Sequence, residues 1–198
     1  MDGHFYALLA RMRYIQRWAL MRNTEPENIQ EHSHMVAVLA HALAVIRNEK
    51  FGGSVDAGAV AVAALYHDAT EILTGDMPTP IKYYNPALRA SYKEVEETAA
   101  NRLLELLPEE LRGDYAPYLL HPDPELEAVV KAADKLDAYL KCVKERKAGN
   151  GEFQTAQAQI WDALQANPLP ALGYFIEHYL PSFELTLDEL NGSTHTMF

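Results

Sequence analysis

The fold is decided by a stretch near the start of the chain, Asn28-Ile29-Gln30-Glu31-His32-Ser33-His34. Asn28 is a residue of the kind that caps helix N-termini, and the glutamate three positions later completes the pattern of a capping box. Apolar residues then recur at the spacing of one helix face, and Gly52-Gly53 ends the pattern. These apolar residues are Met35, Val38, Leu39, Ala42, Leu43 and Ile46. The stretch therefore predicts a long amphipathic helix.

The rest of the chain repeats this helical pattern. Asp56 caps a second predicted helix, which runs to Gly75, and a turn-rich loop with two prolines follows it. Further amphipathic segments cover 86–107, 124–147, 152–166 and 171–180, whereas the apolar alternation of 183–187 is too short and isolated for a sheet. No linker divides the chain. We expect one all-α domain over residues 1–198, built as a helical bundle.

The composition is that of an acidic globular protein. The 198 residues include 28 acidic and 17 basic ones, for a net charge of −11, and 48% are hydrophobic. The densest basic group, Lys141, Lys144, Arg146 and Lys147, is interpreted as the solvated C-terminal end of a helix. Because nucleic-acid polymers are held mainly through basic surfaces, no such partner is expected. A small anionic ligand stays compatible with the negative charge.

Cysteine usage and hydropathy indicate the compartment. Cys142 is the single cysteine, which excludes an intrachain disulfide and a cysteine-based zinc cluster. The N-terminus lacks a basic segment followed by an apolar one, and no run of about 18 apolar residues occurs. We expect a cytoplasmic protein that neither crosses nor binds a membrane.

Ionisable residues lie beside small apolar residues on three predicted helices. At about 100° per residue, the side chains of His67, Asp68 and Glu71 project from the same broad face as Val60 and Ala64. Any one such histidine is more often a hydrogen-bonded core residue than a ligand, but imidazoles and carboxylates that converge from three helices predict a divalent cation. The residues concerned are His32; His67, Asp68 and Glu71; and Asp134 with Asp137.

The order of these residues resembles the H…HD…D pattern of the HD-domain phosphohydrolases. The resemblance extends to the bacterial HD-domain 5′-deoxynucleotidases of the YfbR type and covers nearly the whole chain. It implies an HD-domain helical bundle. The matching stretches are Ile15–Asn23, Glu27–Ser33, Tyr66–Glu71, Thr74–Tyr83, Val130–Asp134 and Pro181–Glu189.

The resemblance implies a single metal ion held by His32, His67, Asp68 and Asp134. Two nitrogens and two oxygens suit Mn²⁺, Co²⁺ or a similar cation and leave positions open for water and a phosphate oxygen. The apolar periodicity of the third helix instead favours Asp137, because it lies nearer the centre of the apolar stripe. We follow the family pattern and expect Asp134 to be the ligand and Asp137 to have a supporting or structural role without contacting the metal.

The resemblance also implies the substrate contacts. Glu71 lies one turn beyond His67 and is expected to take or steer a proton of the attacking water. Arg17 is predicted to clamp a phosphate monoester and Trp18 to form a wall of the sugar pocket. Asp76 is expected at the sugar 3′-hydroxyl or the leaving oxygen. The other expected substrate contacts are Met77, Pro78 and Thr79, together with the ligands His32, Asp68 and Asp134.

These features predict a metal-dependent 5′-deoxynucleotidase. It would hydrolyse deoxyribonucleoside 5′-monophosphates to deoxynucleosides and phosphate and would discriminate against ribonucleotides. One alternative is an HD hydrolase of another nucleotide, such as a nucleoside triphosphate, a cyclic nucleotide or an alarmone. Another is a helical regulator whose metal is merely structural. The resemblance further implies a homodimer, whereas the sequence leaves the metal and the base preference open.

Overall fold

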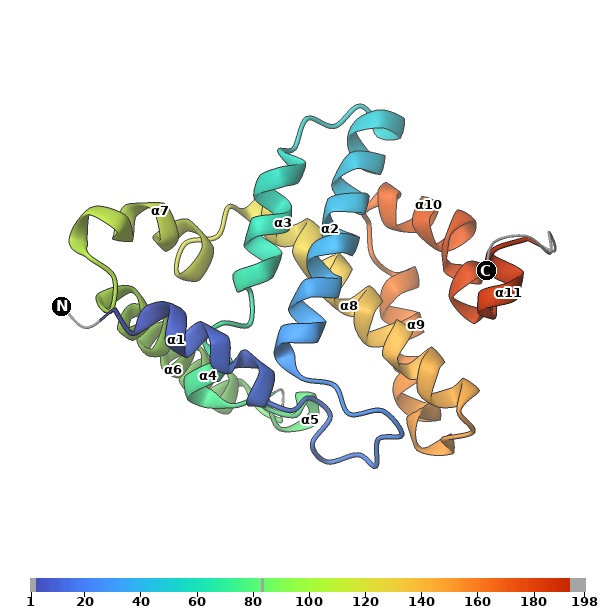
Figure 1. Cartoon of the computed structure of the whole chain (residues 1–198), viewed down its shortest axis with the longest axis horizontal. Helices are drawn as coiled ribbons and strands as arrows, with labels where there is room; N and C mark the ends of the chain where they lie inside the picture. The colour runs from blue at the N-terminus through green and yellow to red at the C-terminus, as the bar shows by residue number, and fades with distance from the viewer. Residues whose placement is uncertain (1–2, 83, 193–198) are drawn as a thin grey trace.

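The structure is a computed structural model that describes residues 3–82 and 84–192 (Figure 1). Within these residues the only β pairing is an isolated antiparallel bridge between Gln16 and Asn28, so the predicted all-α class is confirmed. The elements are α1 (Phe5–Leu9), η1 (Ala10–Tyr14), α2 (Ile29–Phe51), α3 (Ala57–Tyr66), α4 (Glu71–Thr74), α5 (Thr79–Lys82), α6 (Pro86–Glu105), α7 (Glu109–Leu119), α8 (Pro124–Lys147), η2 (Gly151–Phe153), α9 (Gln154–Gln165), α10 (Pro170–His178), η3 (Leu180–Glu184) and α11 (Leu187–Leu190).

Helix α2 begins and ends where its sequence predicts. The Asn28 side chain accepts hydrogen bonds from the backbone N–H groups of Gln30 and Glu31, and the Glu31 side chain returns to the Asn28 backbone. Such a cap contributes about 1 kcal/mol. The helix ends at Gly52, whose φ of 66° is a conformation that glycine adopts without strain. The cap matters for the site because it fixes the first turn of the helix, where His32 lies.

The main hydrophobic core lies where α2, α3 and α8 cross, with α9 and α10 packed beside them (Figure 1). Small residues such as Ala40, Ala64 and Ala133 are fully buried there, so the helix backbones approach one another closely. Larger side chains, including Leu43 and Leu136, fill the remaining space. This close crossing brings polar residues of the three helices near one another.

A second, smaller core determines where α3 ends. Ala69 packs there with Phe5 and with Leu103 and Leu104 of α6, whereas Ala64, one turn earlier, belongs to the main core. The sequence predicts an unbroken helix from Asp56 to Gly75, and this is wrong because α3 ends at Tyr66. The turn that contains His67 and Asp68 therefore lies between the two cores.

Other parts of the chain differ from the sequence pattern as well. Helices α1, η1 and α11 are not predicted because they span five residues or fewer. Helix α7 is not predicted because it contains Gly113 and Pro117, residues that normally interrupt helices. Lys141 is wrongly predicted to be solvated: its side chain is buried beside Glu145, while Lys144, Arg146 and Lys147 are exposed as expected.

No helix among the described residues combines the length and apolarity that crossing a bilayer requires.

Candidate metal centre

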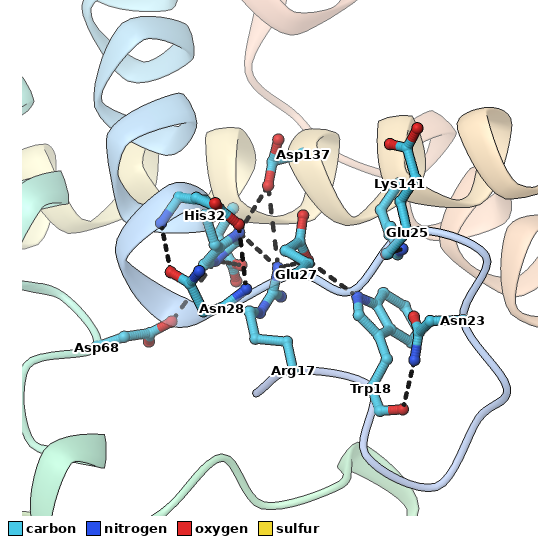
Figure 2. A network of polar contacts seen from close by, with 12 residues as sticks. Arg17, Trp18, Asn23, Glu25, Glu27, Asn28, His32, Asp68, Asp137 and Lys141 are labelled. Atoms are coloured by element: carbon cyan, nitrogen blue, oxygen red, sulfur yellow. Dashed lines mark hydrogen bonds and ion pairs between the residues drawn. The ribbon is translucent and has the colours of Figure 1, made fainter. Parts of the chain in front are cut away.

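His32 and His67 are each oriented by a hydrogen bond from their Nδ1 atom. His67 Nδ1 donates to the backbone carbonyl of Ala64 at 2.7 Å. This bond engages the carbonyl that a continuing helix would use at Asp68, which helps to end α3. His32 Nδ1 lies 2.6 Å from Asp137 Oδ2 and donates to it (Figure 2). With Nδ1 protonated in both rings, each Nε2 carries a free lone pair.

Carboxylates surround these two Nε2 atoms. Asp68 Oδ2 lies 3.2 Å from His67 Nε2 and 3.5 Å from His32 Nε2, and Asp134 Oδ1 lies 3.1 Å from His32 Nε2. One ligand atom from each of His32, His67 and Asp68 lies within 4.8 Å of the other two. The turn after α3, the first turn of α2 and the middle of α8 thus bring together the four residues that the sequence predicts as ligands.

The two aspartates of α8 approach opposite edges of the His32 ring. Asp137 is buried, in agreement with the apolar periodicity of the helix, and its carboxylate contacts Nδ1. The Asp134 side chain is 41% exposed and its carboxylate faces Nε2. A metal ion bound by His32 would be coordinated by Nε2. The position of Asp134 therefore fits a second ligand of that ion, and the position of Asp137 fits a carboxylate that orients the imidazole.

The donor set fits a divalent cation. His32 Nε2, His67 Nε2 and Glu71 Oε2 are buried side-chain atoms without a hydrogen-bond partner among the described residues. Buried polar atoms are normally paired, and imidazole nitrogens left together beside carboxylates suit a metal with mixed nitrogen and oxygen ligands. A water molecule alone would not balance the two aspartate charges.

The charges of the cluster shift the pKa values of its members. Burial opposes protonation of His67, but the adjacent Asp68 carboxylate outweighs it and raises the pKa of His67 to about 9. Burial together with the Asp68 and Asp76 carboxylates raises the pKa of Glu71 to about 9. The cluster therefore favours added positive charge, which a bound cation supplies.

Arg17 and Trp18 lie on a loop next to this cluster. The loop, residues 15–29, is closed at its base by hydrogen bonds from Ile29 N to the Ile15 carbonyl and from Arg17 N to the Glu27 carbonyl. Arg17 Nη1 lies 2.8 Å from Glu27 Oε2, 2.6 Å from His32 Nδ1 and 3.9 Å from Asp137 Oδ2 (Figure 2). A buried guanidinium is therefore held beside the predicted ligands.

Asp76 lies on the loop after α4, close to the 15–29 loop. Burial and the charge of Asp68 raise the pKa of Asp76, while Arg17 and the nearby Trp18 backbone favour its charged form. Met77 and Pro78 follow Asp76 and are half-buried. The side chain of Thr79, another predicted substrate contact, lies outside the described part of the chain.

Glu27 is a residue of the site for which sequence patterns predict no role. Its Oε2 accepts hydrogen bonds from both Arg17 and Trp18, at 2.8 and 3.2 Å. The family-like stretch that contains Glu27 gives no indication of this contact, because hydrogen bonding across an irregular loop leaves no periodicity in the sequence.

The chain is similar in sequence to 5′-deoxynucleotidases. The family model for YfbR-like 5′-deoxynucleotidases matches residues 4–183. The chain is 51% identical over 192 residues to a 5′-deoxynucleotidase of Vibrio cholerae, covering 96% of this chain and 99% of the relative. It is 50% identical over 191 residues to a 5′-deoxynucleotidase of Erwinia tasmaniensis, covering 96% of each.

Solved structures share the fold. An HD-domain phosphohydrolase from Listeria innocua superposes with a TM-score of 0.79 at 24% identity, over 91% of this chain and 88% of the other. The cyanophage S-2L HD phosphohydrolase DatZ, solved with dA and one catalytic Zn²⁺, superposes with a TM-score of 0.62 at 21% identity, over 91% and 95% of the chains.

The fold, the site and the 5′-deoxynucleotidase relatives together define a metal-dependent phosphohydrolase with the HD-domain fold. Within that class, the match over most of its length and the identity of about half show that the chain belongs to the YfbR-like 5′-deoxynucleotidase family.

Proposed function

We propose that this protein hydrolyses deoxyribonucleoside 5′-monophosphates to deoxynucleosides and phosphate, and that it discriminates against ribonucleotides. The observation that carries the proposal is the pair of Nε2 atoms without a hydrogen-bond partner among the described residues, which face two carboxylates beside a largely buried arginine. The 5′-deoxynucleotidase relatives at about 50% identity, and the deoxyadenosine bound in DatZ, support the choice of substrate.

The divalent cation is assigned to His32, His67, Asp68 and Asp134. When bound, it lowers the pKa of a coordinated water and polarises a phosphoryl oxygen. The nitrogen and oxygen donors suit Mn²⁺ or Co²⁺, and the Zn²⁺ of DatZ makes zinc a third candidate. On the protein side, Asp137 and the Ala64 carbonyl keep both imidazoles in the orientation that ligation needs.

Arg17 is assigned to bind the phosphate. Within the described residues, its hydrogen bond to Glu27 and its ion pair with Asp137 both use Nη1, so Nη2 and Nε are the donors assigned to phosphate oxygens. Although burial opposes its charge, the carboxylates of Glu27, Asp134, Asp68 and Asp137 raise the pKa of Arg17, and the guanidinium stays cationic.

Glu71 and Asp76 are assigned to handle protons. Hydrolysis forms a bond from a water oxygen to phosphorus, breaks the bond to the 5′ oxygen, and needs one proton moved from the water to that oxygen. Glu71 is buried with one oxygen unpartnered, and its carboxyl group suits the water side. Asp76, close to the Trp18 backbone, suits the sugar side and is assigned to the 3′-hydroxyl or the leaving oxygen.

Sugar selectivity is assigned to Trp18, with Met77, Pro78 and Thr79 completing the pocket. An apolar pocket rejects an added hydroxyl by only about 10²-fold, so strong selectivity needs a rigid wall against the 2′ carbon. The Trp18 ring is fixed between Phe153, 5.3 Å away by ring centroids, and the hydrogen bond from Nε1 to Glu27. A ring held in this way suits that role.

Hydrolysis of a nucleotide panel, measured by released phosphate and by chromatography of all products, tests the proposal. dAMP, AMP, dATP, a cyclic nucleotide and an alarmone are assayed with Mn²⁺, Co²⁺ or Zn²⁺, before and after chelation. We expect metal-dependent release that is fastest from dAMP. Preference for one of the larger compounds would favour another HD hydrolase activity, and phosphate release that survives chelation would contradict the metal assignment.

Variants then test the pocket. Trp18→Ala is expected to shrink the ratio of kcat/KM for dAMP over AMP, mainly by improving AMP, whereas Arg17→Ala is expected to depress both substrates alike. An unchanged ratio in Trp18→Ala would contradict the assignment of the wall.

Assembly and location remain predictions. A homodimer of single-domain subunits, each spanning residues 1–198, is proposed from the family resemblance, and light scattering measures it directly. The cytoplasmic location is proposed from the single cysteine, and fractionation of cells tests it.

A further inference from the structure

Glu27 contacts both members of the Arg17–Trp18 pair. A single oxygen, Oε2, accepts from Arg17 Nη1 at 2.8 Å and from Trp18 Nε1 at 3.2 Å (Figure 2). The Glu27 backbone carbonyl also accepts from Arg17 N at 2.9 Å. The Glu27 side chain is 15% exposed, so these bonds are shielded from water.

The Trp18 backbone adds a second observation. Its φ of 59° lies in the left-handed region, which is strained for a residue with a bulky side chain. The Trp18 carbonyl is held by Met21 N at 2.9 Å and by Asn23 Nδ2 at 3.3 Å. The indole has two rotatable bonds beyond this backbone, and its Nε1 contact with Glu27 fixes the far end of the ring. The direction of the ring therefore depends on Glu27.

We propose that Glu27 is a positioning residue that couples the phosphate-binding arginine to the sugar-facing tryptophan. This inference rests on the proposed function. Glu27 touches no substrate in this scheme. It aims the Arg17 guanidinium with a charge-assisted hydrogen bond and holds the indole at a fixed distance from it. Selectivity for deoxyribose in a 5′-monophosphate then depends on the Glu27 carboxylate, which contacts Arg17 and Trp18 but not the substrate.

The coupling makes a specific kinetic prediction. Without Glu27 the indole is free to rotate away from the 2′ carbon, so ribonucleotides gain access while Arg17 loses its alignment. A phosphate monoester without a sugar, such as p-nitrophenyl phosphate, uses Arg17 but not the Trp18 wall. Loss of Glu27 should therefore affect dAMP, AMP and p-nitrophenyl phosphate to different degrees, whereas general loosening of the fold would depress all three alike.

The test uses Glu27→Ala and Glu27→Gln, with Glu25→Ala as matched control, because Glu25 is an exposed glutamate of the same loop. We expect Glu27→Ala to lower the dAMP-to-AMP ratio of kcat/KM by about 10- to 100-fold, the range for losing a hydrogen bond to a charged group. Its KM for p-nitrophenyl phosphate should rise while the calorimetric affinity for Mn²⁺ is kept. Glu27→Gln retains an acceptor oxygen and should keep most of the selectivity. Glu25→Ala should match the parent.

A spectroscopic arm reports on the ring itself. In a Trp161→Phe background Trp18 is the single tryptophan, and Glu27→Ala should shift its emission, since the indole N–H loses its partner. Unchanged emission and an unchanged sugar ratio in Glu27→Ala would overturn the inference, as would a uniform fall for all three substrates in both variants. If the parent protein releases no phosphate from dAMP, the proposed function fails instead, and the emission arm still tests whether Glu27 holds Trp18.

Discussion

Helix α8 contributes to two clusters of charged side chains, which differ in whether their buried polar atoms have hydrogen-bond partners. In its middle, Asp134 and Asp137 lie on either side of His32, and His32 Nε2 is buried without a hydrogen-bond partner in the part of the chain that the structure describes. Near its end, Glu145 is fully buried, yet both of its carboxylate oxygens accept hydrogen bonds. The first cluster therefore leaves a buried atom without a partner among the described residues. In the second, which we call the saturated cluster, both carboxylate oxygens of Glu145 are hydrogen-bonded.

The saturated cluster joins α8 to the 15–29 loop. Glu145 accepts from the backbone N–H groups of Thr24 and Glu25, at 2.9 and 3.2 Å, and from Asn150 Nδ2 at 2.8 Å. Lys141 Nζ donates to Glu145 and to the Glu25 carbonyl. Burial opposes the Glu145 charge, but the hydrogen bonds from Lys141, Asn150 and the loop outweigh it and lower the pKa of Glu145.

The difference separates two uses of buried charge. A carboxylate whose hydrogen bonds are all made within the chain holds the loop in one conformation and has no capacity left for a ligand. Atoms left unpartnered in a charged, buried place cost stability unless something binds them. Variants of the first cluster should therefore change activity, and variants of the second should change folding.

Asp68→Asn is expected to have the largest effect. The neutral amide weakens the predicted metal site, so metal-dependent phosphate release should fall to background while the far-ultraviolet circular dichroism stays that of a helical protein. The free energy of unfolding measured without metal should change less than in the Glu145 variant described below. Full activity in Asp68→Asn would remove the site assignment.

Glu71→Gln comes next. Its Oε2 is a buried atom that has no hydrogen-bond partner among the residues described, and a positioned acid or base contributes roughly 10²–10⁴-fold to kcat. We expect a loss of that size in kcat with calorimetric metal affinity kept. A variant that retains kcat and raises only KM would show a binding role for Glu71 instead.

The sequence predicts more of the first cluster than of the second. Capping residues and apolar periodicity locate α2 and α8 closely, and the family pattern names residues that the fold does bring together. The break of α3 before His67 is not predicted, because it depends on packing of Ala69 in a second core far along the chain. Contacts across the irregular 15–29 loop, those of Glu27 and Glu145 among them, leave no periodic pattern, and burial of Lys141 depends on a glutamate one turn away and a loop more than a hundred residues distant.

Glu145→Gln tests the saturated cluster. Removing the charge leaves Lys141 buried without its ion pair, which costs about 3 kcal/mol in comparable buried pairs. Urea unfolding at pH 7 measures the loss. The matched control is Glu127→Gln, since Glu127 and Lys131 form an exposed pair with the same spacing on the same helix. That change should cost no more than about 0.5 kcal/mol.

The same variant has a defined pH dependence. The folded-state pKa of Glu145 is lowered, so its stabilisation is complete above the ordinary glutamate pKa of about 4.3 and is lost as the pH falls below it. The stability difference between the parent and Glu145→Gln should be constant from about pH 5.5 to 8. It should be about 1 kcal/mol smaller at pH 3.5. A difference that stays the same at pH 3.5 would mean that the carboxylate is not stabilised by these bonds.

Asp137→Ala is expected to weaken metal binding less than Asp134→Ala does, and this difference separates the two aspartates of the first cluster. Asp137 contacts His32 Nδ1 and not the nitrogen that faces the site, so its loss should loosen the imidazole and weaken metal affinity by about 10- to 100-fold. Asp137→Asn keeps an acceptor oxygen and should lie closer to the parent, whereas Asp134→Ala should lose calorimetrically detectable binding. If Asp137→Ala eliminates binding and Asp134→Ala retains it, the apolar periodicity of α8 identifies the ligand and the family pattern does not.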